Sequence, residues 1–317
     1  MKNNSRRKFI ARATAASAGA MIAPHLGHGS QQNLEKKEAV DSFSFIFLTD
    51  IHYQQERRAA EGFEVAVDKI NQLEADFVMT GGDLVFDVLR GNFDRSDSLF
   101  SMFSKASKRI KLPMYHCVGN HDLFGIYEES PEDSSHPDYK YGMFQRYFGE
   151  TYYSFDHKGW HFIVLNALDE RDQRYVGIIN EPQVEWLKDD LSKVDKDTPI
   201  AVTLHIPFLT VYRQVYPPGK PAPVKYVENS DEVLNLFNDH NLKLVLQGHM
   251  HWIEDLNVQN KTRFITGGSL AGRPSWRRKD DRGDGKYYNQ EGFMHFMIKG
   301  EDIAWKYIDI GWKSIEE

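Results

Sequence analysis

Eight polar side chains that commonly bind metals or transfer protons follow apolar runs of strand length. They are Asp50, His52, Asp83, Asn120, His121, His205, His249 and His251. Side chains of these types at the end of a buried run are costly unless something binds them. In an open α/β sheet, ligands bind at the carboxyl ends of the strands. We therefore expect the ends of five strands to build one site.

The donor atoms of this set favour metal ions. Asp and Asn supply oxygen and His supplies nitrogen, which suits Zn²⁺, Mn²⁺, Fe or Mg²⁺ rather than a Cys-rich structural zinc site. Seven or eight ligands are too many for one tetrahedral ion and about right for two. Two ions roughly 3.5–4 Å apart form a clamp for phosphoryl transfer, and Asp83 can bridge them through its two oxygens. The expected cofactors are two divalent or mixed-valence ions of Mn, Zn or Fe.

The first half of the chain alternates apolar runs with helical periodicity. Residues 43–49, 76–83 and 112–119 are runs of strand length. Apolar residues recur at helical spacing near 57–74, and again from Leu99 to Ile110. This β-α-β-α-β order implies parallel strands with helices packed on the sheet.

The second half is less regular. It predicts a hairpin over 151–167 that turns at His157-Lys158-Gly159, and a helix that starts at Asn180 and Pro182. Ser230 is expected to cap a later helix. The remaining strands are expected at 199–205, 242–251, 262–267, 293–299 and 302–310, the last three antiparallel.

The first residues resemble an export signal. A basic start precedes an Ala-rich, weakly apolar stretch, and Ser5-Arg6-Arg7-Lys8-Phe9-Ile10 is similar to the twin-arginine motif. We expect a signal peptide over 1–30, a linker over 31–41, and delivery to the periplasm by the export machinery for folded proteins. The alternative is a basic tail. The apolar stretch is too short to span a bilayer, so no stable membrane anchor is expected.

Bulk composition bears on other classes of partner. The net charge of −7 provides no electrostatic footprint for nucleic acid, so such a partner is not expected. The single cysteine, Cys117, excludes an intramolecular disulfide framework. Because Cys117 lies in an apolar run, it is interpreted as a small buried hydrophobic residue.

The motifs, taken in order, resemble those of a known superfamily. The series is Asp50-x-His52, Gly82-Asp83, Gly119-Asn120-His121-Asp122, His205 and Gly248-His249-x-His251, and it resembles the calcineurin-like metallophosphoesterase superfamily. The resemblance implies an α/β fold over 42–312, a four-layer sandwich of two mixed β-sheets flanked by α-helices.

The resemblance also implies a role for each residue. One metal would be held by Asp50, His52, Asp83 and His251, and the other by Asp83, Asn120, His205 and His249. His121 matches the histidine that contacts the phosphate and protonates the leaving group. Either Asp122 or Asp87 would orient it, and the sequence leaves both open.

Departures from the branches of the superfamily bear on the substrate. Purple acid phosphatases carry a tyrosine where this chain has Phe86, so the coloured iron–tyrosinate site is not expected. Protein phosphatases have an Arg-bearing second motif and Glu after Gly-Asn-His. This chain has GGDLVFD and Asp122, closer to the branch of cyclic-nucleotide and glycerophosphodiester phosphodiesterases.

These features predict hydrolysis of a phosphodiester bond in a small phosphate-ester substrate, by direct attack of metal-bound hydroxide. The alternatives are a phosphomonoesterase acting on nucleotides or sugar phosphates, and a metal-binding scaffold without activity. Arg273 and Arg277, in the loop over 267–292, are candidates for binding substrate phosphate. A solvated loop at a sheet edge is the simpler interpretation of this segment.

Overall fold

The computed structural model describes residues 42–211, 226–271 and 291–312. The signal peptide expected over 1–30 and the linker expected over 31–41 lie outside these residues. They stay predictions, which sequencing the N-terminus of the exported protein would test. In the described part of the chain, no helix has both the length and the apolar character needed to cross a membrane.

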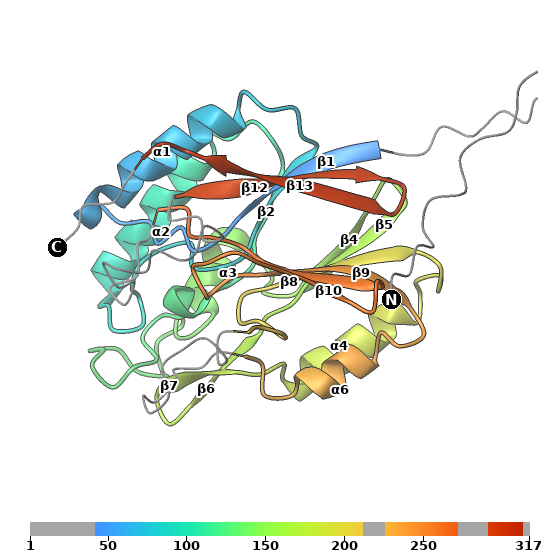
Figure 1. Ribbon diagram of the computed structural model, residues 1–317. Coiled ribbons are helices and arrows are strands. Elements are labelled where there is room, and N and C mark those ends of the chain that lie inside the picture. The colour runs from blue at the N-terminus through green and yellow to red at the C-terminus, as the bar shows by residue number, and fades with distance from the viewer. Residues whose placement is uncertain (1–41, 212–225, 272–290, 313–317) are drawn as a thin grey trace, which may run out of the picture. The chain divides into compact units, whose positions relative to one another are not determined.

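Two mixed β-sheets form the centre of the fold (Figure 1). The first has the spatial order β13-β12-β1-β2-β3. Its strands are β1 (Ser42–Leu48), β2 (Phe77–Thr80), β3 (Met114–Tyr115), β12 (Gly292–Lys299) and β13 (Asp302–Asp309). The first three are parallel, and β12 and β13 complete the sheet with antiparallel pairing.

The second sheet has the order β10-β11-β9-β8-β5-β4. Its strands are β4 (Tyr153–His157), β5 (Trp160–Val164), β8 (Pro199–Leu204), β9 (Asn241–Gln247), β10 (Glu254–Val258) and β11 (Thr262–Thr266). The four inner strands are parallel, and β4 and β10 are antiparallel edges. A separate hairpin joins β6 (Leu168–Arg171) to β7 (Arg174–Gly177).

Helices lie outside both sheets (Figure 1). On the side of the first sheet are α1 (Ala59–Ile70) and α2 (Phe93–Ser107), and α3 (Gly142–Phe148) packs against α2. On the side of the second sheet are α4 (Glu181–Leu191) and α6 (Ser230–Asn235). Two single 3₁₀ turns are η1 (Glu56–Arg58) and η2 (Asn120–Asp122). Helix, sheet, sheet and helix make four layers, which confirms the predicted fold class.

An aromatic core joins the two sheets. The ring of Phe45 in β1 stacks on Phe77 at 5.2 Å and on Phe296 at 4.8 Å, both within the first sheet. Its edge-to-face partner across the sandwich is Phe162 of β5, at 5.8 Å. Cys117 is buried in the same cluster, as its apolar surroundings predicted. This core fixes the sheets face to face, and with them the places where their strands end.

Several expected boundaries move. The helix expected near 57–74 begins at Ala59, because Arg57 and Arg58 have left-handed φ angles of 59° and 58°. The strand expected over 112–119 pairs only at Met114–Tyr115. The prediction that Ser230 caps α6 is wrong by one residue, because Ser230 is already helical and Asn229 precedes it.

The strand expected over 242–251 ends at Gln247, where the chain turns into the site. The strand expected over 262–267 is antiparallel to β10 on one side but parallel to β9 on the other, which corrects an expectation of antiparallel pairing alone. The strand β10 and the β6–β7 hairpin were not predicted.

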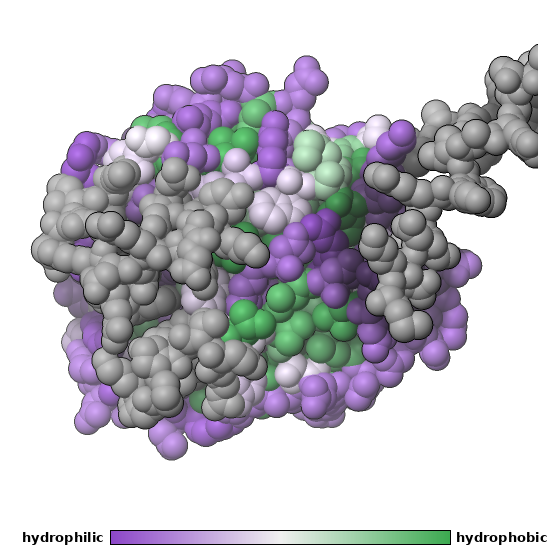
Figure 2. Space-filling model, in the orientation of Figure 1, coloured by the Kyte–Doolittle hydropathy of each residue, from purple (hydrophilic) through white to green (hydrophobic). Residues whose placement is uncertain are grey.

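The surface is mostly polar, as the 27% of charged residues leads one to expect. Figure 2 shows hydrophilic side chains over much of the face in view, with hydrophobic residues grouped near its lower centre. Among the described residues, the exposed large hydrophobic side chains are Val211, Tyr226, Val258 and Met297, none more than 39% exposed.

His161 of β5 gives the fold a pH-dependent contact away from the predicted ligands. Its Nδ1 lies 2.7 Å from Asp156 Oδ1, and its Nε2 lies 3.0 Å from Asp190 Oδ2. Burial alone would lower the pKa of His161, but hydrogen bonds to Asp190 and Asp156 raise it above its ordinary value. This stabilisation is therefore complete below the unfolded-state pKa of about 6.5. It is lost as pH rises through the folded-state pKa.

We expect His161→Gln to lower the free energy of unfolding more at about pH 5.5 than at about pH 8.5. Urea unfolding of both proteins at both pH values measures this. Taking the difference between wild type and variant cancels the titration of the other histidines. Equal differences at the two pH values would contradict this account of His161.

Candidate metal centre

The loops that follow five strands bring the predicted ligands to one edge of the fold. The ligands follow β1 (Asp50, His52), β2 (Asp83), β3 (Asn120), β8 (His205) and β9 (His249, His251). All of these residues are buried, with at most 8% of each exposed. The strand ends therefore lie together, as we expected from the sequence.

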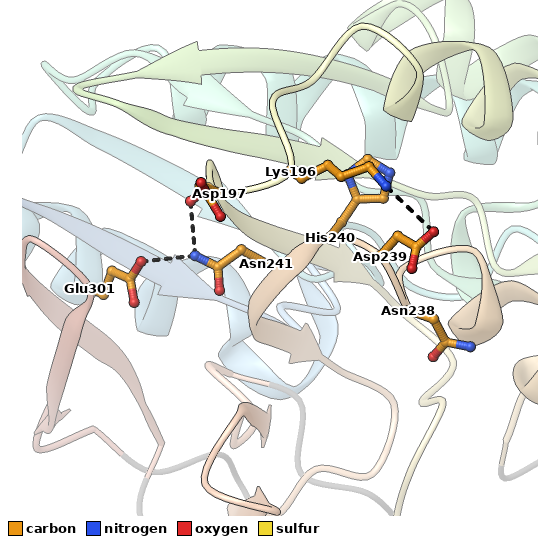
Figure 3. A pocket seen from close by; sticks show the side chains of 7 residues that line it. All are labelled: Lys196, Asp197, Asn238, Asp239, His240, Asn241 and Glu301. Atoms are coloured by element: carbon orange, nitrogen blue, oxygen red, sulfur yellow. Dashed lines mark hydrogen bonds and ion pairs between the residues drawn. The ribbon is translucent and has the colours of Figure 1, made fainter.

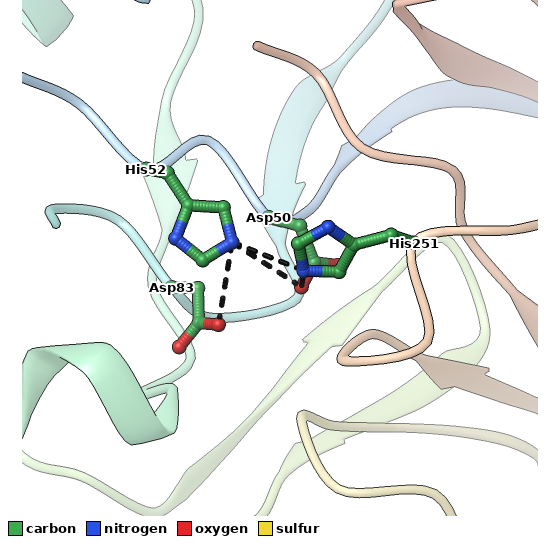
Figure 4. Close-up of side chains that lie close together, drawn as sticks. All are labelled: Asp50, His52, Asp83 and His251. Atoms are coloured by element: carbon green, nitrogen blue, oxygen red, sulfur yellow. Dashed lines mark hydrogen bonds and ion pairs between the residues drawn. The ribbon is translucent and has the colours of Figure 1, made fainter. Parts of the chain in front are cut away.

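A first group consists of Asp50, His52, Asp83 and His251 (Figure 4). His251 Nε2 lies 3.0 Å from Asp50 Oδ1 and 3.1 Å from His52 Nε2. His52 Nε2 lies 3.6 Å from Asp83 Oδ2. Figure 4 shows the two rings and the two carboxylates directed toward one small volume.

A second group shares Asp83 with the first. It adds His205 and His249, and Asn120 lies between them. His205 Nε2 is 3.3 Å from Asp83 Oδ2. Asn120 Oδ1 is 3.0 Å from His205 Nε2 and 2.9 Å from His249 Nδ1. The two groups are therefore adjacent, with one carboxylate between them.

The atoms of the first group fit a cation better than they fit one another. A neutral imidazole has one N–H, and a carboxylate only accepts hydrogen bonds. Because His52 Nε2 and His251 Nε2 face each other at 3.1 Å, at most one of them donates in this contact if the rings are neutral. Buried His52 Nδ1 has no hydrogen-bond partner among the described residues. An ion that accepts these lone pairs removes the conflict, and Asp, Asn and His suit a divalent ion.

The backbone at this edge is held in an uncommon conformation. Five of the predicted ligands have left-handed φ angles, namely Asp50 at 52°, His52 at 46°, Asp83 at 52°, His249 at 68° and His251 at 55°. Non-glycine residues seldom occupy this region, and each costs on the order of 1–3 kcal/mol unless the surroundings hold it there. Strain of this kind gathers at sites where side-chain placement matters more than backbone stability.

Hydrogen bonds between the loops keep these conformations in place. The backbone N–H of Asp50 donates to Gly82 O at 3.1 Å, and that of His52 donates to Asp83 O at 2.9 Å. The N–H of His249 donates to the Asp50 carboxylate at 3.1 Å. The ligand loops of both sheets are thus tied to one another.

Glycine permits the closest approach between loops. A Cβ added to Gly119 would lie 1.9 Å from the backbone nitrogen of Asp83. At Gly82, where φ is 90°, a Cβ would lie 2.6 Å from His205 Nδ1. Side chains at either position would push two ligand loops apart.

Charges inside the site oppose the effect of burial. Burial alone would raise the pKa of Asp50, but the neighbouring His251 and His205 outweigh this effect and lower the pKa to about 2. Burial lowers the pKa of His52 to about 3, which leaves this imidazole neutral, as a metal ligand must be. Burial alone would lower the pKa of His205, but Asp83 raises it to about 9. Without a metal ion, the carboxylate of Asp83 thus favours positive charge at His205, and a bound cation would supply that charge in place of the proton.

His121 lies beside both groups without joining either. Its ring is 4.9 Å from that of His52 and stacks on Phe86 at 5.0 Å. Its Nδ1 lies 3.3 Å from Asp87 Oδ1. Burial alone would lower the pKa of His121, but Asp83 and Asp87 raise it above its ordinary value. A protonated histidine in this position suits donation to a departing oxygen.

Asp122 has different partners from Asp87. Its carboxylate accepts the backbone N–H groups of Leu84, Val85 and Gly119 at 2.8–3.1 Å. Burial, and then the neighbouring Asp83, raise the pKa of Asp122 to about 7. Asp122 therefore joins the loop after β2 to the loop after β3. Of the two residues that the sequence left open, Asp87 is the one that faces His121.

Some functional expectations fall outside the described residues, and some neighbours were not expected. Arg273 and Arg277 lie outside the described ranges. The unpredicted hairpin places the ring of Tyr175 at 6.1 Å from that of His249. Its turn has left-handed φ angles at Asp172 and Gln173 but lacks the glycine that usually marks such a turn, so no local signal pointed to it.

A depression of about 610 Å³ lies elsewhere on the protein (Figure 3). It is lined by Lys196, Asp197, Asn238, Asp239, His240, Asn241 and Glu301. Most of these residues lie just before β8 or at the start of β9, and Glu301 lies in the turn between β12 and β13. The predicted ligands His205, His249 and His251 follow the opposite ends of β8 and β9. Since a strand rises about 3.3 Å per residue, the two places are separated by the length of β9. Asn241 donates to Asp197 O and Glu301, so this lining holds the fold together at that end.

Asp122 and Asp87 form a matched pair for mutation. Asp122→Ala leaves three buried N–H groups without their acceptor, at roughly 1–3 kcal/mol each. We expect it to lower the free energy of unfolding by roughly 3 kcal/mol or more and to weaken metal binding. Among the described residues, the side chain of Asp87 pairs with His121 and Arg90, so we expect Asp87→Ala to change the free energy of unfolding by less than about 1 kcal/mol. Urea unfolding measures both variants, and equal losses would contradict the division of roles.

Comparisons with known proteins agree with this geometry. The calcineurin-like phosphoesterase family matches residues 43–252, more than half of the chain. Arabidopsis thaliana purple acid phosphatase 23 is 34% identical over 108 residues, which cover 33% of this chain and 21% of that protein. A Fibrobacter succinogenes protein named as a probable cyclic nucleotide phosphodiesterase is 22% identical, covering 69% of this chain and 77% of its own. Arabidopsis thaliana purple acid phosphatase 7 is 22% identical, with 87% and 85% covered.

Solved structures show the same fold. A dimetal phosphatase from Danio rerio superposes with a TM-score of 0.60 at 16% identity, covering 86% of this chain and 98% of that one. Plasmodium GAP50, described as the anchor in the inner membrane complex, superposes with a TM-score of 0.50 at 14% identity, covering 85% of each chain. With its sandwich fold and the match over residues 43–252, this chain belongs to the calcineurin-like phosphoesterase family.

Proposed function

We propose that this protein is a two-metal phosphoesterase that hydrolyses phosphodiester bonds. The observation that carries the proposal is the position of Asp83. Its Oδ2 lies 3.6 Å from His52 Nε2 in the first ligand group and 3.3 Å from His205 Nε2 in the second. A carboxylate shared in this way is suited to holding two ions close together. Membership of the calcineurin-like phosphoesterase family supports the same chemistry.

The residues divide into two ligand sets around Asp83. Asp50, His52 and His251 would hold one ion with it, and His205, His249 and Asn120 would hold the other. Two such ions supply a water of lowered pKa and compensate the charge of the phosphoryl group. Mn, Zn and Fe all suit this donor set.

His121 would bind the phosphoryl group and protonate the leaving group. The Asp87 carboxylate faces Nδ1 at 3.3 Å, which places a proton there and orients the ring. Nε2 is then the atom that donates a proton to the departing ester oxygen. Phe86 stacks on one face of the imidazole and restricts its rotation.

Charge pairing near the site favours a diester. A phosphodiester carries one negative charge, whereas a monoester carries up to two. Two nearby cations are already paired, since Arg90 binds Asp87 at 2.8 Å and Arg174 lies 3.2 Å from Glu129. Hydrolysis of monoesters is the second candidate, because purple acid phosphatases are among the similar proteins.

The choice between diester and monoester is tested with two chromogenic substrates. We expect metal-loaded protein to have a kcat/KM for bis(p-nitrophenyl) phosphate at least about tenfold above that for p-nitrophenyl phosphate, a difference of about 1.4 kcal/mol. Chelator-treated protein is the control, and activity should return with Mn²⁺ or Zn²⁺. A preference for the monoester would replace the diesterase with a phosphatase. Absence of metal-dependent hydrolysis of either substrate would favour the scaffold.

The role of His121 is tested separately from metal binding. We expect His121→Ala to keep its metal content and to lose roughly 10²–10⁴-fold in kcat on a diester with an alkyl leaving group. The loss should be smaller for p-nitrophenolate, which departs without a proton. Steady-state kinetics with both leaving groups, alongside metal analysis, measures the effect. Equal losses on both leaving groups would contradict proton donation by His121.

A further inference from the structure

Tyr175 of β7 lies beside the second ligand group and has an unused hydroxyl. Its ring meets that of His249 edge to face, with centroids 6.1 Å apart and planes at 83°. No hydrogen bond joins this hydroxyl to another described residue. Because Tyr175 is only half-buried and its hydroxyl is not among the buried polar groups that lack a partner, this hydroxyl is open to solvent and to a ligand at the border of the site.

A chain of contacts connects Tyr175 to the second ligand group and to His121. Its ring is parallel to that of Tyr127, at 6.3 Å. The guanidinium groups of Arg90 and Arg174 lie 4.5 Å and 4.4 Å from the centre of the Tyr127 ring. Arg90 also binds Asp87, the residue that faces His121. The contacts thus run from His249 to His121 around one side of the site.

The hairpin that carries Tyr175 is fixed at several points. Arg171 binds both carboxylate oxygens of Glu228, at 3.0 Å and 2.9 Å. The backbone N–H of Glu228 donates to Gly177 O at 2.7 Å, and the Tyr141 hydroxyl donates to Leu168 O. Figure 1 shows β6 and β7 apart from the two large sheets, so these contacts take the place of a sheet. Tyr175 is therefore held in position before a substrate arrives.

The chemistry of the phenol suits a phosphoryl oxygen. The ordinary pKa of a phenol is about 10, so at neutral pH the hydroxyl is protonated and can act as a neutral hydrogen-bond donor. Arg90 and Arg174 both lie over the ring of Tyr127, which packs on Tyr175. Because Arg90 is paired with Asp87 and Arg174 with Glu129, these two cations hold Tyr127 and Tyr175 in place. A neutral donor matches the single charge of a phosphodiester.

We propose that Tyr175 is a substrate-binding residue whose hydroxyl donates a hydrogen bond to a non-bridging phosphoryl oxygen of the substrate. Arg90, Tyr127 and Arg174 are its positioning residues. The inference rests on the proposed function, because it assumes that a phosphoryl group occupies the centre. It goes beyond that function by assigning part of substrate recognition to the β6–β7 hairpin.

The test measures how tightly inorganic phosphate binds to the metal-loaded protein. Calorimetry gives the affinity directly, and competitive inhibition of bis(p-nitrophenyl) phosphate hydrolysis gives it independently. Tyr175→Phe keeps the ring and removes the hydroxyl. We expect it to weaken phosphate binding and to raise KM roughly tenfold to hundredfold, with kcat changed less than about threefold. Tyr152→Phe is the matched control, because Tyr152 packs on Trp186. We expect it to change neither constant.

The outcomes separate this inference from the proposed function. Unchanged phosphate affinity in Tyr175→Phe, with wild-type protein active and binding phosphate, would overturn the role of Tyr175 alone. Wild-type protein that neither binds phosphate nor hydrolyses a phosphoester would overturn the proposed function and this inference with it. If Tyr175→Phe is less stable, the rise in Tm that phosphate produces still reports binding. A rise equal to that of wild type would also overturn the inference.

Discussion

The structure of this site depends on one electrostatic constraint, the close approach of atoms that carry lone pairs or negative charge. Asp50 Oδ1 and His52 Nε2 both lie within 3.1 Å of His251 Nε2, and Asp83 Oδ2 lies 3.3 Å from His205 Nε2. Such a buried cluster is unfavourable unless protons or metal ions lie between its members. Hydrogen bonds satisfy only part of it, so two divalent ions are the simplest account. The strained backbone at these residues is consistent with a site built around ions.

The rest of the fold supplies the rigidity that this arrangement needs. The aromatic core around Phe45 sets the two sheets face to face, so that strands of both sheets end at one edge. Asp122 ties the loop after β2 to the loop after β3, and Gly119 lets those loops touch. Beside the second ligand group, the hairpin that carries Tyr175 is held by its own contacts to Glu228 and Tyr141. The ligand loops are therefore packed rigidly against the core. For this reason, loss of Asp122 is expected to displace ligands and weaken metal binding.

The ligand set could be predicted from the sequence because parallel strands place their carboxyl ends at one edge, wherever the loops go. The order of strands and helices in the first half of the chain could also be predicted, because the spacing of apolar residues along the chain differs between strands and helices. The choice between Asp87 and Asp122 could not be made, because both follow strand ends and only the path of the loops decides which faces His121. The left-handed backbone of the ligands could not be predicted, because Asp and His adopt it more often than most residues but still only in a minority of positions. Tyr175 was missed because its partners Tyr127 and His249 are remote in sequence.

The number of metal ions per chain tests the two-ion centre most directly. Mass spectrometric metal analysis of purified protein, with Asp83→Ala, His251→Ala and His205→Ala variants, gives that number. The account predicts about two ions in the wild type and about one in each histidine variant, because each histidine serves one ion. Asp83→Ala should retain less than about one, because that carboxylate serves both ions. A wild type with a single ion, or an Asp83→Ala protein that keeps both, would contradict the shared-carboxylate centre.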